Sequence, residues 1–193
     1  GNSQSSSRSV SGGNFAYDSY FAVARYLGDG KPVVPVGTPG NDNLNIDFSV
    51  EDNILNGLAG DDILSANYSS GANILNGDAG NDTIYANYSS GNNTIDGGNN
   101  NDILYVSYSS GSNIVNGGNG DDLVDAISSS GNNTVDGGNG NDTLYISNSK
   151  GNNIVNGGKG DDLVDAGGSS GDNTVNGGSG NDNIQGGGGD DNI

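Results

Sequence analysis

An aspartate recurs every 20 residues along most of the chain, and this spacing is the first indication of chemistry. The column consists of Asp42, Asp62, Asp82, Asp102, Asp122, Asp142, Asp162 and Asp182. Each is the sixth residue of a glycine-rich stretch of the form G-G-x-G-x-D-x-U-x, in which U is aliphatic. Carboxylate oxygens are the ligands that a hard divalent cation such as calcium prefers. The column therefore predicts metal binding.

The composition argues against other kinds of chemistry. The 193 residues include no His and no Cys, so the commonest general base, imidazole ligands and thiolate chemistry are all missing. A net charge of −19, from 24 acidic and 5 basic residues, argues against a nucleic-acid partner. No run of 18 apolar residues is present that could insert into a membrane. We therefore expect that the chain is not an enzyme in its own right.

The aspartates belong to a 20-residue repeat that begins at Gly37 and keeps its register through residue 185. One unit, residues 137–156, reads GGNGNDTLYISNSKGNNIVN. It contains the nonapeptide, a two-residue insertion, and nine residues that echo the first nine with Ser for Gly and Asn for Asp. The second half therefore carries a column of its own, which consists of Asn53, Asn73, Asn93, Asn113, Asn133, Asn153 and Asn173.

The pattern inside each unit predicts two turns and two short strands. Aliphatic residues occupy the eighth position of every unit, and the tenth position continues the same face of the strand because side chains alternate along it. Glycine-rich turns of six residues permit positive φ angles and close backbone approach. Coils stacked about 4.8 Å apart would place parallel sheets on both sides. We predict an all-β fold, a parallel β-roll or β-solenoid of about eight 20-residue coils.

Stacking also brings one carboxylate per coil into a line of like charges. Neighbouring aspartates would then repel each other within a few ångströms, and the few aliphatic residues per coil bury too little surface to order 20 residues alone. A divalent cation between successive aspartates converts this repulsion into attraction. We therefore expect a metal-free solenoid to loosen or unfold, and Ca²⁺ to hold it together along one edge.

The units that start at Gly117, Gly137, Gly157 and Gly177, with GGGGDD at 186–191, closely resemble the nonapeptide calcium repeat of repeats-in-toxin (RTX) proteins. This resemblance implies a parallel β-roll with calcium between consecutive turns of one edge. It implies as ligands the position-six aspartates of both turns and backbone carbonyls of positions one to four, among them Gly97, Gly117, Gly137, Gly157 and Gly177. About seven ions would then lie between successive pairs, from Asp42/Asp62 to Asp162/Asp182.

The sequence departs from the family pattern in two places. The early units are imperfect (GTPGND, GLAGDD, GDAGND and GGNNND), which predicts weaker or partly empty sites there. The opposite edge reads S-S-G-x-N, with neutral Asn where the family has Asp. We expect Ser and Asn hydrogen bonds and no metal on that edge. A second, weak calcium column is the alternative.

The remaining segments suggest a linker, a cap and a contact surface. Residues 1–13 are Ser-rich and predict a flexible linker, and residues 14–36 predict a cap on the first coil or a strand donated to a neighbouring chain. The second option would allow end-to-end homo-oligomers through 14–36 and an uncapped C-terminal coil of the solenoid at 37–193. Phe48, Tyr68, Tyr88 and Tyr108 share one column and predict a stacked ladder that fills a wider corner, or alternatively a docking surface.

These observations predict a calcium-binding structural module of an extracellular or cell-surface bacterial protein, such as a spacer. We expect the chain to be a piece of a longer protein. One alternative is the calcium-folded C-terminal region of a larger type I secreted enzyme or toxin. Another is a self-assembling extracellular filament or surface-layer subunit. The sequence does not identify the parent protein, its organism or an adhesion target.

Overall fold

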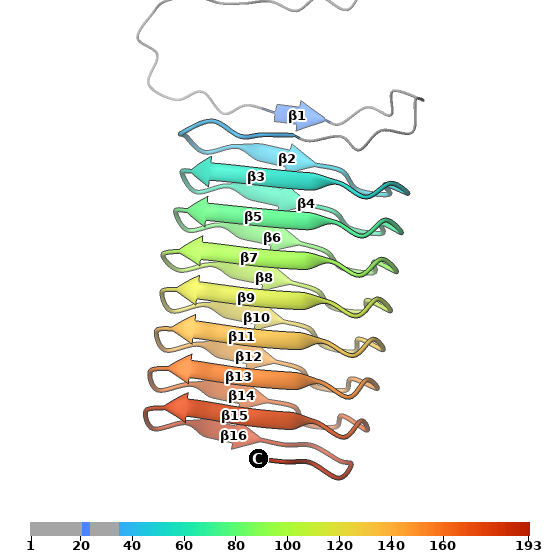
Figure 1. The fold of residues 1–193 in the computed structure, drawn as a ribbon, viewed down its shortest axis with the longest axis vertical. Helices are drawn as coiled ribbons and strands as arrows, with labels where there is room; N and C mark the ends of the chain where they lie inside the picture. Colours follow the sequence, from blue (N-terminus) through green and yellow to red (C-terminus); the bar gives the residue numbers. More distant parts are fainter. Residues whose placement is uncertain (1–20, 24–34) are drawn as a thin grey trace, which may run out of the picture.

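The computed structural model describes residues 21–23 and 35–193, and every regular element in these ranges is a β-strand (Figure 1). The strands form two parallel sheets, one of nine strands and one of seven. The chain passes from a strand of one sheet to a strand of the other, so each 20-residue coil adds one strand to each wall. The predicted all-β parallel solenoid is confirmed.

The nine-stranded sheet contains short strands, each of three residues. These are β1 (Phe21–Val23), β2 (Asn43–Asn45), β4 (Ile63–Ser65), β6 (Thr83–Tyr85), β8 (Ile103–Tyr105), β10 (Leu123–Asp125), β12 (Thr143–Tyr145), β14 (Leu163–Asp165) and β16 (Asn183–Gln185). The seven-stranded sheet contains longer strands, each of six residues. These are β3 (Ile54–Ala59), β5 (Ile74–Ala79), β7 (Thr94–Asn99), β9 (Ile114–Asn119), β11 (Thr134–Asn139), β13 (Ile154–Lys159) and β15 (Thr174–Ser179).

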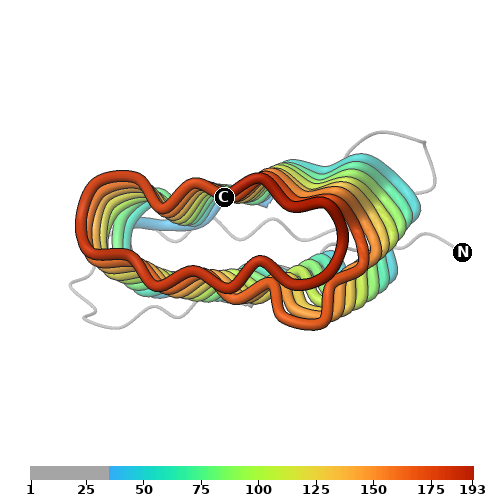
Figure 2. The backbone as a smooth tube through the Cα atoms, turned by 90° about the horizontal axis from the view of Figure 1, so that it is seen from below, coloured from blue at the N-terminus to red at the C-terminus, as the bar shows by residue number. Residues whose placement is uncertain are grey.

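The register between neighbouring coils is constant at 20 residues. Val124 of β10 pairs with Leu144 of β12, and Val135 of β11 pairs with Val155 of β13. Seen along the solenoid axis, the coils superimpose as one flattened ring (Figure 2). Each position of the repeat therefore becomes a column of stacked residues, which is why a chemical pattern in one coil recurs along the whole edge.

The core lies between the two sheets and consists of aliphatic side chains from both. In the coil that starts at Gly57, Leu64 and Ala66 come from one wall and Leu75 from the other, and all three have an exposed fraction of 0%. The strands place them inward because side chains alternate between the two faces. The predicted inward columns at the eighth and tenth positions are confirmed by these burial values.

The longer strands extend further than the sequence indicated. Each runs through the first three residues of the nonapeptide, so the turn proper starts at position four instead of position one. Leu58 pairs with Asp78 and Ala59 with Ala79 in this extension. Position two has positive φ in every coil from β3 onward, so neighbouring backbones keep the same local shape and their hydrogen bonds continue.

The short strand β1 pairs in parallel with β2 and extends the nine-stranded sheet by one strand. The expectations for residues 1–13, and for the rest of segment 14–36, lie outside the residues that the structure describes. No helix long and apolar enough to cross a membrane occurs among the described residues.

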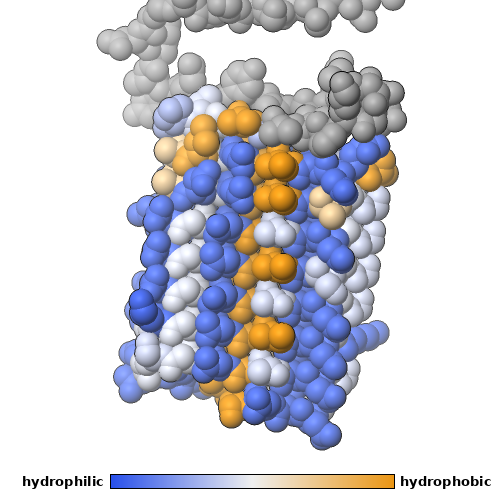
Figure 3. Space-filling model, in the orientation of Figure 1, coloured by the Kyte–Doolittle hydropathy of each residue, from blue (hydrophilic) through white to orange (hydrophobic). Residues whose placement is uncertain are grey.

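Two apolar columns lie on the surface. The rings of Phe48, Tyr68, Tyr88 and Tyr108 stack with centroids 4.9–5.0 Å apart, so the predicted ladder is confirmed. The rings are 49–70% exposed, so the expectation that they fill a corner is wrong. The second column is the stripe on the outer face of the seven-stranded sheet, where Ile and Thr alternate along much of the length (Figure 3).

Candidate calcium sites along the aspartate column

The aspartate column lies inside one edge of the solenoid, directly before the short strands. Asp62, Asp82, Asp102, Asp122, Asp142 and Asp162 are 1–2% exposed and Asp42 is 4% exposed, whereas Asp182 in the last full coil is half-buried. Position six turns inward because the tight turn ends there and the strand begins at the next residue. Eight predicted metal ligands are therefore brought into one column, seven of them shielded from water.

One oxygen of each carboxylate links successive coils. The backbone N–H of each aspartate donates a hydrogen bond to the Oδ1 atom of the aspartate 20 residues later, with N–O distances of 2.7–3.0 Å along the whole column. The bond from Asp102 to Asp122, for example, is 2.8 Å long. These bonds fix each carboxyl group in the plane between two coils.

The other oxygen has no hydrogen-bond partner among the described residues. This holds for the Oδ2 atom of Asp62, Asp82, Asp102, Asp122, Asp142 and Asp162, and for Oδ1 of Asp42. A buried polar atom without a partner costs about 1–3 kcal/mol, and more if it is charged. One such atom per coil, at the same place in each, indicates a ligand that binds there.

The glycines at position one leave room beside this oxygen. A Cβ atom placed on Gly97 would lie 2.5 Å from Asp102 Oδ2 and 2.5 Å from the carbonyl oxygen of Gly117 in the next coil. Gly117, Gly137 and Gly157 have the same two neighbours, their own aspartate and the next glycine carbonyl. A carboxylate oxygen and a carbonyl oxygen from adjacent coils thus face one small cradle, and both are ligands that calcium accepts.

The remaining predicted glycine, Gly177, faces the carboxylate of Asp182 without a carbonyl oxygen from a further coil. Gly57 and Gly77, absent from the predicted ligands, face the same cradle as Gly97 does. Their units are imperfect at positions two and three, but position one is glycine in every unit, and that signal was sufficient to find them.

Burial raises the pKa of the carboxyl groups in this column. Desolvation is the largest cause, the N–H bond from the preceding coil lowers the pKa, and the charges of nearby aspartates raise it again. The pKa rises from 3.8 to about 7 in Asp62, about 8 in Asp102, about 7 in Asp122 and about 6 in Asp142. The pKa values of Asp82 and Asp162 are also raised. Ionising this column without a cation is therefore costly.

The donor set suits calcium in particular. No group of three or more His, Cys, Asp or Glu side chains gathers tightly enough to hold a metal within residues 35–193. An ion between two coils would therefore have two carboxylates at most and would depend on backbone carbonyls for the rest. Calcium tolerates such sets of six to eight oxygens in flexible geometry, whereas magnesium demands a near-ideal octahedron.

A family model of the RTX calcium-binding nonapeptide repeat, which spans four copies, matches most of the chain. The matched ranges are 50–68, 67–88, 89–107, 109–126, 127–145, 149–169 and 167–193. The chain belongs to this family. A search of curated proteins found no match. The predicted RTX membership is confirmed, and the matches begin after the first aspartate, Asp42.

The opposite edge of this RTX solenoid is an amide ladder. Asn73 Nδ2 donates to Ser69 Oγ at 2.9 Å, to the Gly71 carbonyl at 3.0 Å and to Asn93 Oδ1 at 3.0 Å, and its backbone N–H also donates to Asn93 Oδ1. The same bonds recur at Asn93, Asn113 and Asn153. The predicted hydrogen bonds of Ser and Asn are confirmed. The absence of metal from this edge stays a prediction.

The first RTX unit neutralises its aspartate internally. The backbone N–H and the hydroxyl of Thr38 both donate to Asp42 Oδ2, at 2.5 and 3.1 Å. Thr38 therefore supplies two donors where the later units have a partnerless oxygen. Sequence reasoning missed this residue, although a hydroxyl at position two, four residues before the aspartate, was a visible signal.

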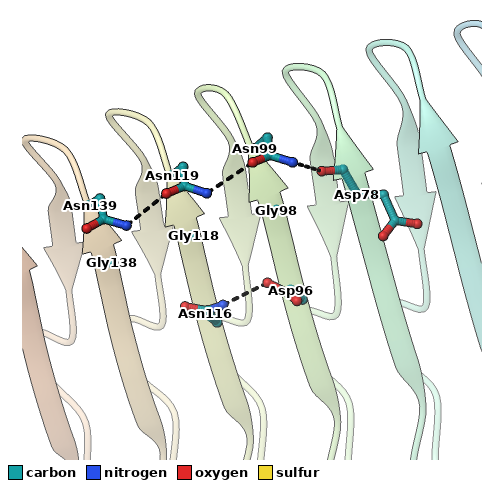
Figure 4. A pocket seen from close by; sticks show the side chains of 9 residues that line it. All are labelled: Asp78, Asp96, Gly98, Asn99, Asn116, Gly118, Asn119, Gly138 and Asn139. Carbon is teal, nitrogen blue, oxygen red and sulfur yellow. Dashed lines mark hydrogen bonds between the residues drawn. The ribbon is translucent and has the colours of Figure 1, made fainter.

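A shallow groove of about 490 Å³ crosses the outer face of the seven-stranded sheet, away from the aspartate column (Figure 4). Asn139 donates to Asn119 at 2.8 Å and Asn119 donates to Asn99 at 3.0 Å along one side. On the other side Asn116 donates to Asp96 at 2.8 Å. The stacking of coils accounts for these amide ladders, and we assign no ligand to the groove.

Proposed function

The chain is a calcium-binding β-roll module. We propose that it serves as a structural spacer or surface module of a bacterial protein outside the cell, with a fold that depends on calcium. About seven ions would lie in one column, between successive aspartates from Asp42/Asp62 to Asp162/Asp182, and the position-one glycine carbonyls would complete the sites.

The single observation that supports this proposal is the row of buried carboxylate oxygens without partners. The asparagine edge has the same backbone spacing, yet the printed hydrogen bonds of Asn73, Asn93 and Asn113 use both their amide oxygen and their amide nitrogen. Two edges built from the same repeat therefore differ in one respect, which is that only the aspartate edge leaves an oxygen available for a cation.

The distribution of acidic residues supports the same proposal. Within residues 37–185, twelve Asp or Glu residues lie outside position six, and none of them has an acid 20 residues away in a neighbouring coil. Asp121, for example, is followed by Asn141 and then by Asp161. Adjacent like charges are thus avoided in every column except the aspartate column, where all eight positions are acidic. A cation between the coils removes the reason for avoidance there.

The chain's own residues would act by folding instead of by catalysis. Each Oδ2 atom and each position-one carbonyl would hold the ion, and Oδ1 would keep the coils in register through its N–H bond. Bound calcium supplies positive charge that stabilises the ionised form of the column. Low calcium inside a cell and higher calcium outside it would then restrict folding to the outside.

Circular dichroism in chelator, calcium and magnesium tests this function directly. We expect calcium to increase the β-sheet signal and the unfolding temperature, and magnesium at the same ionic strength to do so much less, because the sites rely on many carbonyl oxygens. An identical spectrum and unfolding temperature in chelator and in calcium would contradict the proposal. An equal response to magnesium would contradict the assignment of the metal.

The two alternatives, a calcium-folded region of a larger secreted enzyme or toxin and a filament subunit, remain predictions. The calcium sites proposed here are common to all three. β1 pairs with β2 of the same chain, which supports a cap more than a strand donated to a neighbour. Analytical ultracentrifugation in calcium distinguishes the filament, which would sediment as a concentration-dependent series of larger particles.

A further inference from the structure

The coils of residues 37–116 and those of residues 117–193 are held together by different side chains. In the two main core columns, seven of eight residues in the first part are Leu or Ile: Leu44, Leu55, Leu64, Leu75, Ile84, Ile95 and Leu104, with Val115 as the exception. In the second part only Leu144 and Ile184 are Leu or Ile, and the other five are Val. The early coils therefore bury more apolar surface per turn.

The aromatic ladder is confined to the early coils. Phe48, Tyr68, Tyr88 and Tyr108 stack in series with interplanar angles of 4–5°, and the same column continues as Ser128, Asn148 and Gly168. The four aromatic residues have φ angles of 57–62°, a region that bulky residues seldom occupy. Their presence at this strained position is explained by the stacking, because each ring covers its neighbours.

The calcium side shows the opposite trend. At position two Leu58 and Asp78 have φ angles of 82° and 74°, whereas the glycines of later coils have φ angles of 103–113°. At position four Asn100 has a φ of 77°, whereas glycines there have φ angles of 115–141°. A change of this size turns the neighbouring peptide carbonyls, which are the other ligands of the proposed sites. The early sites are thus less regular than the later ones.

We propose that the solenoid has two parts with different needs for calcium. Residues 37–116 keep their fold when calcium is removed, through their larger core and their aromatic ladder. Residues 117–193 fold only when calcium binds, and they add coil by coil onto the preceding part through the parallel backbone ladder between β9 and β11. This inference rests on the proposed function, because it assumes that calcium binds the aspartate column.

Hydrogen–deuterium exchange of the full chain, in chelator and in saturating calcium, tests the proposal. In chelator we expect amides of β4, β6 and β8 to exchange at least about tenfold more slowly than those of β10, β12 and β14. In calcium the two groups should be protected to a similar degree. Equal exchange of both groups in chelator, whether fast or slow, would overturn the proposal, and so would the reverse order.

Two variants separate the aromatic ladder from calcium. Tyr68→Ser with Tyr88→Ser uses the residue found at Ser128, and it should remove the protection of β4–β8 in chelator but not in calcium. Ser128→Tyr, at a φ of 58°, should extend chelator protection to β10 by lengthening the ladder. Tyr145→Ser changes a tyrosine outside the stacked pairs and serves as the control. Unchanged protection in the double variant would overturn the role of the ladder.

The same samples separate this inference from the function on which it rests. Calcium uptake measured by titration calorimetry reports on the aspartate column alone. If no calcium binds, the proposed function fails. If calcium binds but both parts of the solenoid respond alike, only the present inference fails.

Discussion

Replacing Asp122 by Asn should change the free energy of unfolding in opposite directions with and without calcium. Asp122 lies between Asp102 and Asp142 and therefore borders two successive gaps between coils. Asn has the same shape, and its Oδ1 can still accept the N–H of Asp102, as Asn93 does for Asn73 on the other edge. The substitution thus removes one charge and leaves the packing intact.

The pKa of Asp122 sets the size of the effect without metal. Its rise from 3.8 to about 7 covers about three pH units, and each unit corresponds to about 1.4 kcal/mol. Ionising the group at pH 8 therefore costs up to about 4 kcal/mol, and in chelator Asp122→Asn should be more stable than the parent by about 2–4 kcal/mol. In calcium it should be less stable by about 3–5 kcal/mol, the usual cost of removing one partner of a buried charge pair.

Urea unfolding at pH 8, followed by circular dichroism in chelator and in calcium, measures both effects. Asp121→Asn is the matched control, because it removes the same charge from the exposed neighbouring residue and keeps an acceptor for the N–H of Asn141. That control should change the free energy of unfolding by no more than about 0.5 kcal/mol in either condition. Destabilisation by Asp122→Asn in chelator, or no effect in calcium, would refute the reasoning.

Three further changes test other parts of the structure. In chelator the free energy of unfolding should fall as pH rises from about 4 to about 8, because unfolded aspartates ionise near 3.8 while the buried ones keep protons up to pKa values of about 6–8; urea titrations that show a rise would contradict this. Gly97→Ala should weaken calcium binding and stability because its Cβ would lie 2.5 Å from two oxygens, whereas Gly40→Ala, 3.9 Å from its nearest neighbour, should be tolerated; equal calcium titrations would argue against the cradle. Leu58→Gly and Asn100→Gly should each raise the unfolding temperature by relieving positive φ, by about 1 kcal/mol in free energy, and lowered temperatures would show that the side chains contribute more than the strain costs.

Much of the fold could be predicted from columns of identical residues. Because the register is a constant 20 residues, Asp122 and Asp142, or Val135 and Val155, had to become neighbours once the coils stacked. Alternation along a strand then fixed which side chains face the core. Repetition therefore gave both the parallel topology and the single edge on which the aspartates lie.

The details that the sequence did not reveal depend on geometry between coils. Which carboxylate oxygen of Asp102 pairs with a backbone N–H, and which one is left over, follows from the offset of one turn above the next. The extension of β3 through Leu58 depends on φ angles that a glycine-rich motif only permits. The exposure of Tyr68 depends on where the two-residue insertion turns its side chain. None of these quantities repeats as a residue type.

The number of calcium ions bound per chain tests the central claim most directly. Titration calorimetry on the full chain, checked by equilibrium dialysis, should give about seven ions, one for each gap between the eight aspartates from Asp42 to Asp182. A slightly lower number would fit an internally neutralised Asp42. A number near fourteen would mean that the asparagine edge also binds metal, and no binding at all would contradict the account of the aspartate column.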